Sequence, residues 1–242
     1  MNFFKLFFKY TTSKAYIKVD LDSIFEMVQK LDVHRTPKLM KKFNQHFVSM
    51  KIYSDVGYAE KLNKKRFKKG TFGHDLKWFM RSMEDDLYKK SLKKLKAKNK
   101  KEKIFFQHAM FQHDVIHFLN DYDTSPLGEV MVLSNNLANE WRWSYFVILL
   151  SSFFMSIGNY FKKTKIPLSK RWMYFHPYIF LRLVFEGYKI GKRSAWIMTV
   201  DFDNLFNKTT QEVKKDLGIE DSVYWKKIRP LWLITHKQYK MN

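Results

Sequence analysis

The sequence has 242 residues, which is enough for one large domain or two small ones. It contains no cysteine, and this excludes disulfides, thiolate zinc sites and cysteine nucleophiles. The formal net charge of +22 far exceeds the charge that keeps a small domain soluble, so a polyanionic partner is expected. Nucleic acid is the commonest partner of this kind, and anionic lipid comes second.

The N-terminal region, residues 1–60, is predicted to contain a strand and two helices. Residues 16–21 alternate between apolar and polar side chains, which is typical of a strand. Ser23 and Glu26 have the spacing of a capping box and therefore predict a helix start. A second helix is predicted to begin at Pro37, with its lysines on the outer face.

Residues 61–103 carry more than half of the net charge and predict a basic arm. Its lysines would lie all round a helix and repel one another unless anions were close. Because lysine far outnumbers arginine, diffuse contact with a phosphate backbone is expected instead of base reading. The candidate nucleic-acid-binding residues, in this arm and further along the chain, are Lys64, Lys65, Arg66, Lys68, Lys69, Lys89, Lys90, Lys93, Lys94, Lys96, Lys98, Lys100, Lys101, Lys103, Lys170, Arg171, Lys192 and Arg193.

Residues 104–161 form an apolar stretch that predicts either a helical core or a membrane segment. Ser125 followed by Pro126 marks a helix start, from which one long helix or two helices end to end would run. Residues 143–161 contain no charged side chain and are about as long as a bilayer span. Their small polar residues gather on one face, which is typical of a membrane helix and equally of a buried helix in a soluble protein. Both interpretations stay open.

Residues 162–242 read as a basic, aromatic C-terminal region. Residues 195–200 are apolar and predict a short strand. Thr209 and Glu212 form a second capping box, and Gly218 stands where a helix C-terminal cap belongs. The last residues form a basic extension that would suit a path along RNA or along a neighbouring subunit.

One pair of histidines has the spacing of a helical metal site. His113 and His117 are four residues apart and fall on one helix face, and His108, Asp121 and Asp123 lie near them in the sequence. The sequence identifies no third ligand, so a packed interface is the alternative interpretation.

Two aspartate pairs resemble the metal-binding carboxylates of nucleotidyl transferases. Asp201 and Asp203 follow the predicted strand, and Asp20 and Asp22 repeat the pattern near the start. Both pairs also precede helical stretches, where aspartate is a good cap. The chain has 8 glycines and none of them forms a phosphate-binding loop.

The composition as a whole resembles that of a known group of sequences. The chain begins with Met, is rich in Phe, Tyr and Lys, has no cysteine, and shows no import signal in its first ten residues. In this it resembles the divergent open reading frames of AT-rich protist mitochondrial genomes, those of ciliates above all. The resemblance implies a subunit of the mitochondrial ribosome or of a respiratory-chain complex.

These observations predict a mainly α protein, α+β with few short strands, that has a long apolar central helix. We expect a structural, rRNA-binding subunit in the mitochondrial matrix, with rRNA and neighbouring ribosomal proteins as its partners. The alternative is an accessory subunit of a respiratory-chain complex, with residues 143–161 in the inner membrane beside other subunits and anionic lipid. No enzymatic activity, cofactor or small-molecule substrate is expected, and a nucleic-acid enzyme using the aspartate pairs ranks third.

Overall fold

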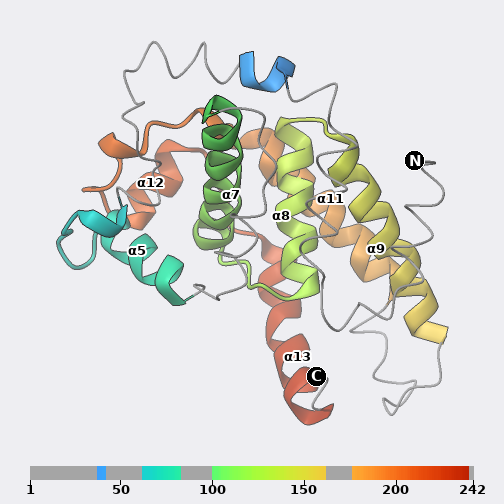
Figure 1. Ribbon diagram of the computed structural model, residues 1–242. Helices are drawn as coiled ribbons and strands as arrows, with labels where there is room; N and C mark the ends of the chain where they lie inside the picture. Colours follow the sequence, from blue (N-terminus) through green and yellow to red (C-terminus); the bar gives the residue numbers. More distant parts are fainter. Residues whose placement is uncertain (1–36, 42–61, 83–99, 162–175, 240–242) are drawn as a thin grey trace. The chain divides into compact units, whose positions relative to one another are not determined.

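The computed structural model describes residues 37–41, 62–82, 100–161 and 176–239 (Figure 1). These residues form helices joined by turns and short loops, which confirms the mainly helical fold. No strand occurs among them. Residues 37–41 are helical, as expected from Pro37, whereas the predicted strand at residues 16–21 and the helix after Ser23 lie outside the described residues.

The described helices belong to two compact units. The first unit contains α8 (Pro126–Asn139), α9 (Trp143–Phe161), α11 (Pro177–Arg193) and α13 (Val223–Tyr239). The second contains α5 (Phe72–Ser82), α7 (Lys100–Asn120), the 3₁₀ helices η1 (Ile197–Thr199) and η2 (Phe202–Asn204), and α12 (Thr210–Asp216). Each unit therefore combines segments that are distant in the sequence.

In the first unit, the segment that starts at Ser125 forms two helices, so that alternative is confirmed and the single long central helix is wrong. Ser125 caps α8 by accepting a hydrogen bond from the Gly128 N–H, and Pro126 is its first residue, as predicted. The helix ends before Glu140, whose carboxylate forms a buried ion pair with Arg142 at 2.8 Å. Glu140 has an extended backbone conformation, so the helix stops there, and the ion pair offsets the cost of burying both charges.

The apolar segment from 143 to 161 is the helix α9, and most of its serines are buried. Ser144, Ser151 and Ser156 are buried, whereas Phe154 is half exposed. No helix in the described part of the chain combines the length and the apolar character needed to cross a membrane.

Helix α11 lies against α8 through two glycines. A Cβ atom at Gly187 would lie 2.8 Å from the Met131 carbonyl oxygen, and one at Gly191 would lie 2.4 Å from the Asn135 carbonyl oxygen. Only glycine permits so close an approach of the two helices, because any side chain would displace backbone.

The second unit is built around aromatic rings. Phe72 of α5 is fully buried and stacks on Phe202 and Phe206, with ring centroids 6.1 Å apart in each case. Phe111 of α7 meets the Phe202 ring edge-on at 5.4 Å. These contacts join α5, α7 and η2 into one core.

The prediction of a strand at residues 195–200 is wrong. The segment holds the 3₁₀ helix η1, in which the Val200 N–H donates to the Ile197 carbonyl at 3.2 Å. Ile197 and Met198 are both buried. The apolar run reflects the burial of Ile197, Met198 and Val200 in a packed core, and burial of this kind does not require a strand.

The cap predictions nearby are confirmed. Thr209 and Glu212 form the capping box of α12. Gly218 follows its last turn with φ +64°, the left-handed conformation that glycine adopts without strain.

The described part of the predicted basic arm is folded into the second unit. Leu62 and Leu76 are buried. The Lys77 ammonium donates to the carbonyls of Asn63 and Lys65 at 2.8 and 2.7 Å, and so closes the short helical turn at residues 62–64. Lysines here stabilise the local fold, so residues 62–82 are not an extended arm.

Replacement of Gly191 by Val tests the close contact between α11 and α8. The added side chain would collide with the Asn135 carbonyl, and we expect the free energy of unfolding to fall by about 1–3 kcal/mol. Urea denaturation followed by tryptophan fluorescence measures this. The exposed Lys189→Ala on the same helix is the control and should change stability little; equal stability of Gly191→Val and the parent chain would contradict the packing.

Candidate metal centre

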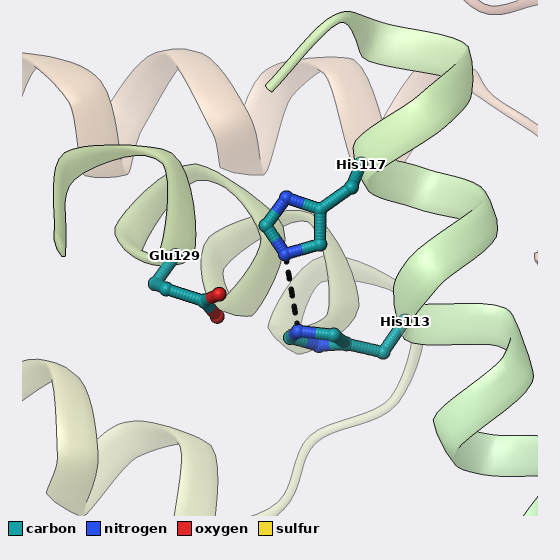
Figure 2. A group of neighbouring side chains, drawn as sticks. All are labelled: His113, His117 and Glu129. Carbon is teal, nitrogen blue, oxygen red and sulfur yellow. Dashed lines mark hydrogen bonds between the residues drawn. The ribbon is translucent and has the colours of Figure 1, made fainter. Parts of the chain in front are cut away.

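Two imidazoles face each other on helix α7. The Nε2 atoms of His113 and His117 are 3.1 Å apart, because residues four positions apart lie on one helix face (Figure 2). His117 is buried and His113 is half-buried. The predicted histidine pair is therefore brought together.

A tight turn at the end of α7 orients His117. The ring Nδ1 atom lies 3.1 Å from the Tyr122 carbonyl oxygen, and the Tyr122 N–H donates to the His117 carbonyl at 3.0 Å. Since a carbonyl only accepts, Nδ1 of His117 carries the proton and its Nε2 atom presents a lone pair toward His113.

This turn depends on an unusual backbone conformation. Asp121 has φ +54°, in the left-handed region that aspartate tolerates better than most residues. The conformation reverses the chain after α7, so that the Tyr122 carbonyl comes back to the His117 ring. Asp121 contributes to the site through this geometry.

Glu129 supplies a carboxylate from the first turn of α8. One ligand atom from each of His113, His117 and Glu129 lies within 4.8 Å of the others, as Figure 2 shows. The Ser125 cap and Pro126 start α8 a few residues after α7 ends, which keeps Glu129 close to the histidines along the chain.

The distances fit a metal ion. Two nitrogen atoms that each lie about 2.1 Å from one ion, at a tetrahedral or octahedral angle, are about 3.0–3.4 Å apart. The observed Nε2 separation of 3.1 Å agrees with this. The carboxylate requires a closer approach, which a rotation of the Glu129 side chain can supply. His113, His117 and Glu129 form the only group of three or more potential ligands found in the described parts of the chain, and they are named here the 113/117/129 site.

Sequence reasoning missed Glu129 as the third ligand. The available signal was the helix start at Ser125 and Pro126, because it places an acidic residue in a first helical turn shortly after the histidines. Asp121 and Asp123, which lie near the histidines in the sequence, stabilise the turn between α7 and α8. Asp121 adopts a positive φ, and the Asp123 carboxylate accepts a hydrogen bond from the Ser125 N–H at 3.0 Å.

His108 does not join the site. It is buried, and its Nε2 atom lies 3.2 Å from the Met198 carbonyl oxygen in η1. Burial lowers the pKa of His108 to about 4, and the hydrogen bond to Met198 opposes this only in part. A neutral ring is thereby fixed in the core.

The structure does not support the hypothesis that Asp201 and Asp203 bind metal ions. Asp201 caps η2 by accepting from the Asp203 N–H at 3.0 Å, and Asp203 forms an ion pair with Lys65 at 3.0 Å. Both carboxylates thus have structural roles, as the capping alternative predicted. Asp20 and Asp22 lie outside the described residues.

The candidate nucleic-acid-binding residues fall into three groups. Lys64, Lys65, Arg66, Lys68, Lys69, Lys192 and Arg193 are exposed. Lys100, Lys101 and Lys103 lie in the first turn of α7. The others, Lys89, Lys90, Lys93, Lys94, Lys96, Lys98, Lys170 and Arg171, are outside the described residues. Arg193 pairs with Glu220 at 2.8 Å, so some of the positive charge is neutralised within the protein.

Comparison with known proteins decides the family. Residues 51–222 match the model of the family described as coenzyme Q (ubiquinone) biosynthesis protein Coq4. The chain belongs to the Coq4 family. Its fold is also similar to the crystal structure of a protein from Nostoc punctiforme described as a ubiquinone biosynthesis protein. That match has a TM-score of 0.60 and 16% identity, and covers 90% of this chain and 97% of the other. No curated protein matches the sequence.

Membership of the Coq4 family corrects the functional predictions. The expected ribosomal protein with rRNA and ribosomal partners is wrong, and so is the alternative of a respiratory-complex subunit beside anionic lipid. The chain is not a ciliate-type reading frame of either kind. The error has a physical reason: net charge reports on solubility and on the sign of a partner, and says nothing about fold or chemistry. A mitochondrial location agrees with the family, whereas a place on the matrix ribosome does not.

Titration of His108 should appear in the stability of the protein. Its folded pKa of about 4 lies below the ordinary value of about 6.5, so between these values only the unfolded chain binds the proton. The contribution of His108 is fully present above pH 6.5, declines as the pH falls, and amounts to about 3 kcal/mol. Denaturation of the parent chain and of His108→Gln at several pH values measures this. The variant should lose less stability than the parent between pH 6.5 and 4, and parallel curves would contradict the assignment.

Proposed function

We propose that the chain acts in ubiquinone biosynthesis and that the 113/117/129 site holds a divalent metal ion for this role. The family match supports the pathway. The observation that carries the metal site is the facing pair of Nε2 atoms at 3.1 Å, with one ring fixed by the Tyr122 carbonyl.

The donor set suits particular ions. Two imidazoles and one carboxylate bind zinc in catalytic sites and also form the three-ligand face typical of non-haem iron(II). Calcium and magnesium prefer all-oxygen ligands and fit less well. With three protein ligands, a bound ion keeps an open position, through which it can polarise or orient an oxygen atom of an aromatic intermediate.

The protein's own groups prepare the site. His117 presents the lone pair of Nε2 because its Nδ1–H donates to the Tyr122 carbonyl. Without metal, the short contact requires His113 to carry its proton on Nε2 and donate it to His117. Metal binding requires that proton to leave Nε2, so His113 becomes a ligand through its other tautomer.

A non-catalytic role stays a prediction. An open coordination position can hold an intermediate for another protein of the pathway or take part in its conversion. Activity of the purified, metal-loaded chain toward ring intermediates of ubiquinone synthesis would distinguish the two.

Removal of either kind of ligand should weaken metal binding and impair function together. We expect His117→Gln and Glu129→Gln to lower the affinity for zinc or cobalt(II) by at least about tenfold. Calorimetry and the visible spectrum of the cobalt(II) form measure this. In cells that lack their own Coq4 protein, the parent chain should restore ubiquinone and these variants should not, as measured by chromatography of lipid extracts.

Asp203→Asn is the matched control, because this carboxylate pairs with Lys65 and lies in η2. It should leave both readouts unchanged. Full metal affinity in His117→Gln would contradict the metal site, whereas lost metal binding with normal ubiquinone would contradict its role in the pathway.

The left-handed turn should matter to metal affinity through geometry. Asp121→Gly retains the φ of +54° without strain, whereas Asp121→Val disfavours it by about 1–2 kcal/mol. We expect zinc affinity to fall roughly tenfold in Asp121→Val and to persist in Asp121→Gly. Calorimetry gives the affinities, and thermal unfolding of the metal-free proteins shows any general loss of stability. Equal affinities in both variants would show that the turn does not position His117.

A further inference from the structure

Helix α11 has two apolar faces, and only one of them is covered. Its inner face, which includes Leu183, Gly187 and Gly191, is buried against α8. The opposite face is solvent-exposed. A surface helix of a globular protein normally has polar residues on the face that points away from the core.

Four large side chains occupy the exposed face. They are Tyr178, Leu181, Phe185 and Tyr188, with exposed fractions of 58, 42, 64 and 36%. Their spacing of three, four and three residues is that of the a and d positions of a heptad. At 100° per residue they form a stripe about 80° wide, here named the α11 seam.

The width of the seam indicates what it fits. A narrow stripe is the signature of helix against helix, whereas a helix lying in a membrane surface presents a broad apolar face. The α11 seam therefore favours a helix as its occupant.

Charge indicates the chemistry of that helix. Arg182, Lys189 and Lys192 are exposed along or beside the seam. The acidic residue of α11, Glu186, is turned away and accepts hydrogen bonds from the Ser222 hydroxyl at 2.7 Å and the Tyr224 N–H at 3.0 Å. Two copies of the seam would bring like charges together, so a second copy of this chain is disfavoured.

One of these cations is already held in place. The Arg182 guanidinium donates to the Tyr178 hydroxyl at 2.9 Å and lies 4.6 Å from the centre of the Tyr224 ring. A guanidinium fixed in this way loses little conformational entropy when it meets a carboxylate. Exposed tyrosine, phenylalanine and arginine are also the residues that dominate protein interfaces.

We propose that the α11 seam docks an amphipathic helix of a partner protein, with apolar residues on its seam and acidic residues beside them. The partner helix packs on Leu181 and Phe185, and its carboxylates pair with Arg182 and Lys189. This surface is independent of the 113/117/129 site.

The test uses the full-length chain and two synthetic helical peptides. Both peptides carry leucine at their a and d positions; one has glutamate at the flanking positions and the other has lysine. We expect the glutamate peptide to bind at least tenfold more tightly than the lysine peptide, as measured by fluorescence anisotropy at low salt. The double variant Leu181→Ser, Phe185→Ser should weaken binding of the glutamate peptide at least tenfold.

Two further variants guard against indirect effects. Trp78→Ser removes an equally exposed aromatic side chain, 63% exposed on α5, and should leave binding unchanged. Arg182→Glu together with Lys189→Glu should reverse the preference, so that the lysine peptide binds more tightly, a result that loss of folding cannot produce.

Several outcomes would overturn the proposal. These are equal binding of the two peptides, binding that survives the double serine variant, and self-association that depends on Leu181 and Phe185. Binding to phosphatidylcholine–phosphatidylglycerol vesicles that requires these two residues, while peptide binding does not, would assign the surface to a membrane instead.

Discussion

The hydrogen bond between His117 and the Tyr122 carbonyl is the interaction on which the candidate site depends. It selects the tautomer of a buried imidazole and directs Nε2 toward His113, which lies 3.1 Å away. The bond exists because α7 ends in a residue with positive φ, Asp121, which turns the chain back on its last turn. A backbone conformation in one residue thus controls the chemistry of a side chain four residues earlier.

Close helix contacts explain the construction of the first unit. Gly187 and Gly191 let the backbone of α11 approach the backbone carbonyls of α8 closely. The buried ion pair of Glu140 and Arg142 lies just after the C-terminal end of α8. The inner face of α11 also buries large apolar residues such as Leu183, so the exposed Phe185 belongs to a second apolar stripe of the same helix, the α11 seam.

The positive charge has a different meaning from the one that the composition suggested. Lys77 closes a helical turn, Lys65 pairs with Asp203, and Arg182 is fixed between two tyrosines. Each of these cations has a defined partner in the protein itself. These three cations therefore have structural roles within a protein of the Coq4 family, which the net charge alone did not indicate.

Local signals in the sequence were sufficient for the helix ends. Ser125 with Pro126, and Thr209 with Glu212, form their caps in the structure because each cap is completed within four residues. The spacing of the histidines was also sufficient to place them on one face of α7. Residues 195–200 were misjudged, since an apolar run looks the same whether a neighbouring strand or a packed core covers it.

What only the tertiary structure decided is which distant groups come together. The sequence by itself determined a helical protein, its caps and a pair of imidazoles on one face. It could not add Glu129 as a third ligand, nor remove Asp203 from consideration, because both depend on where the chain goes after a helix ends. Local hydrogen bonds set the ends of helices, whereas ligand sets and exposed seams arise from packing between segments far apart in sequence.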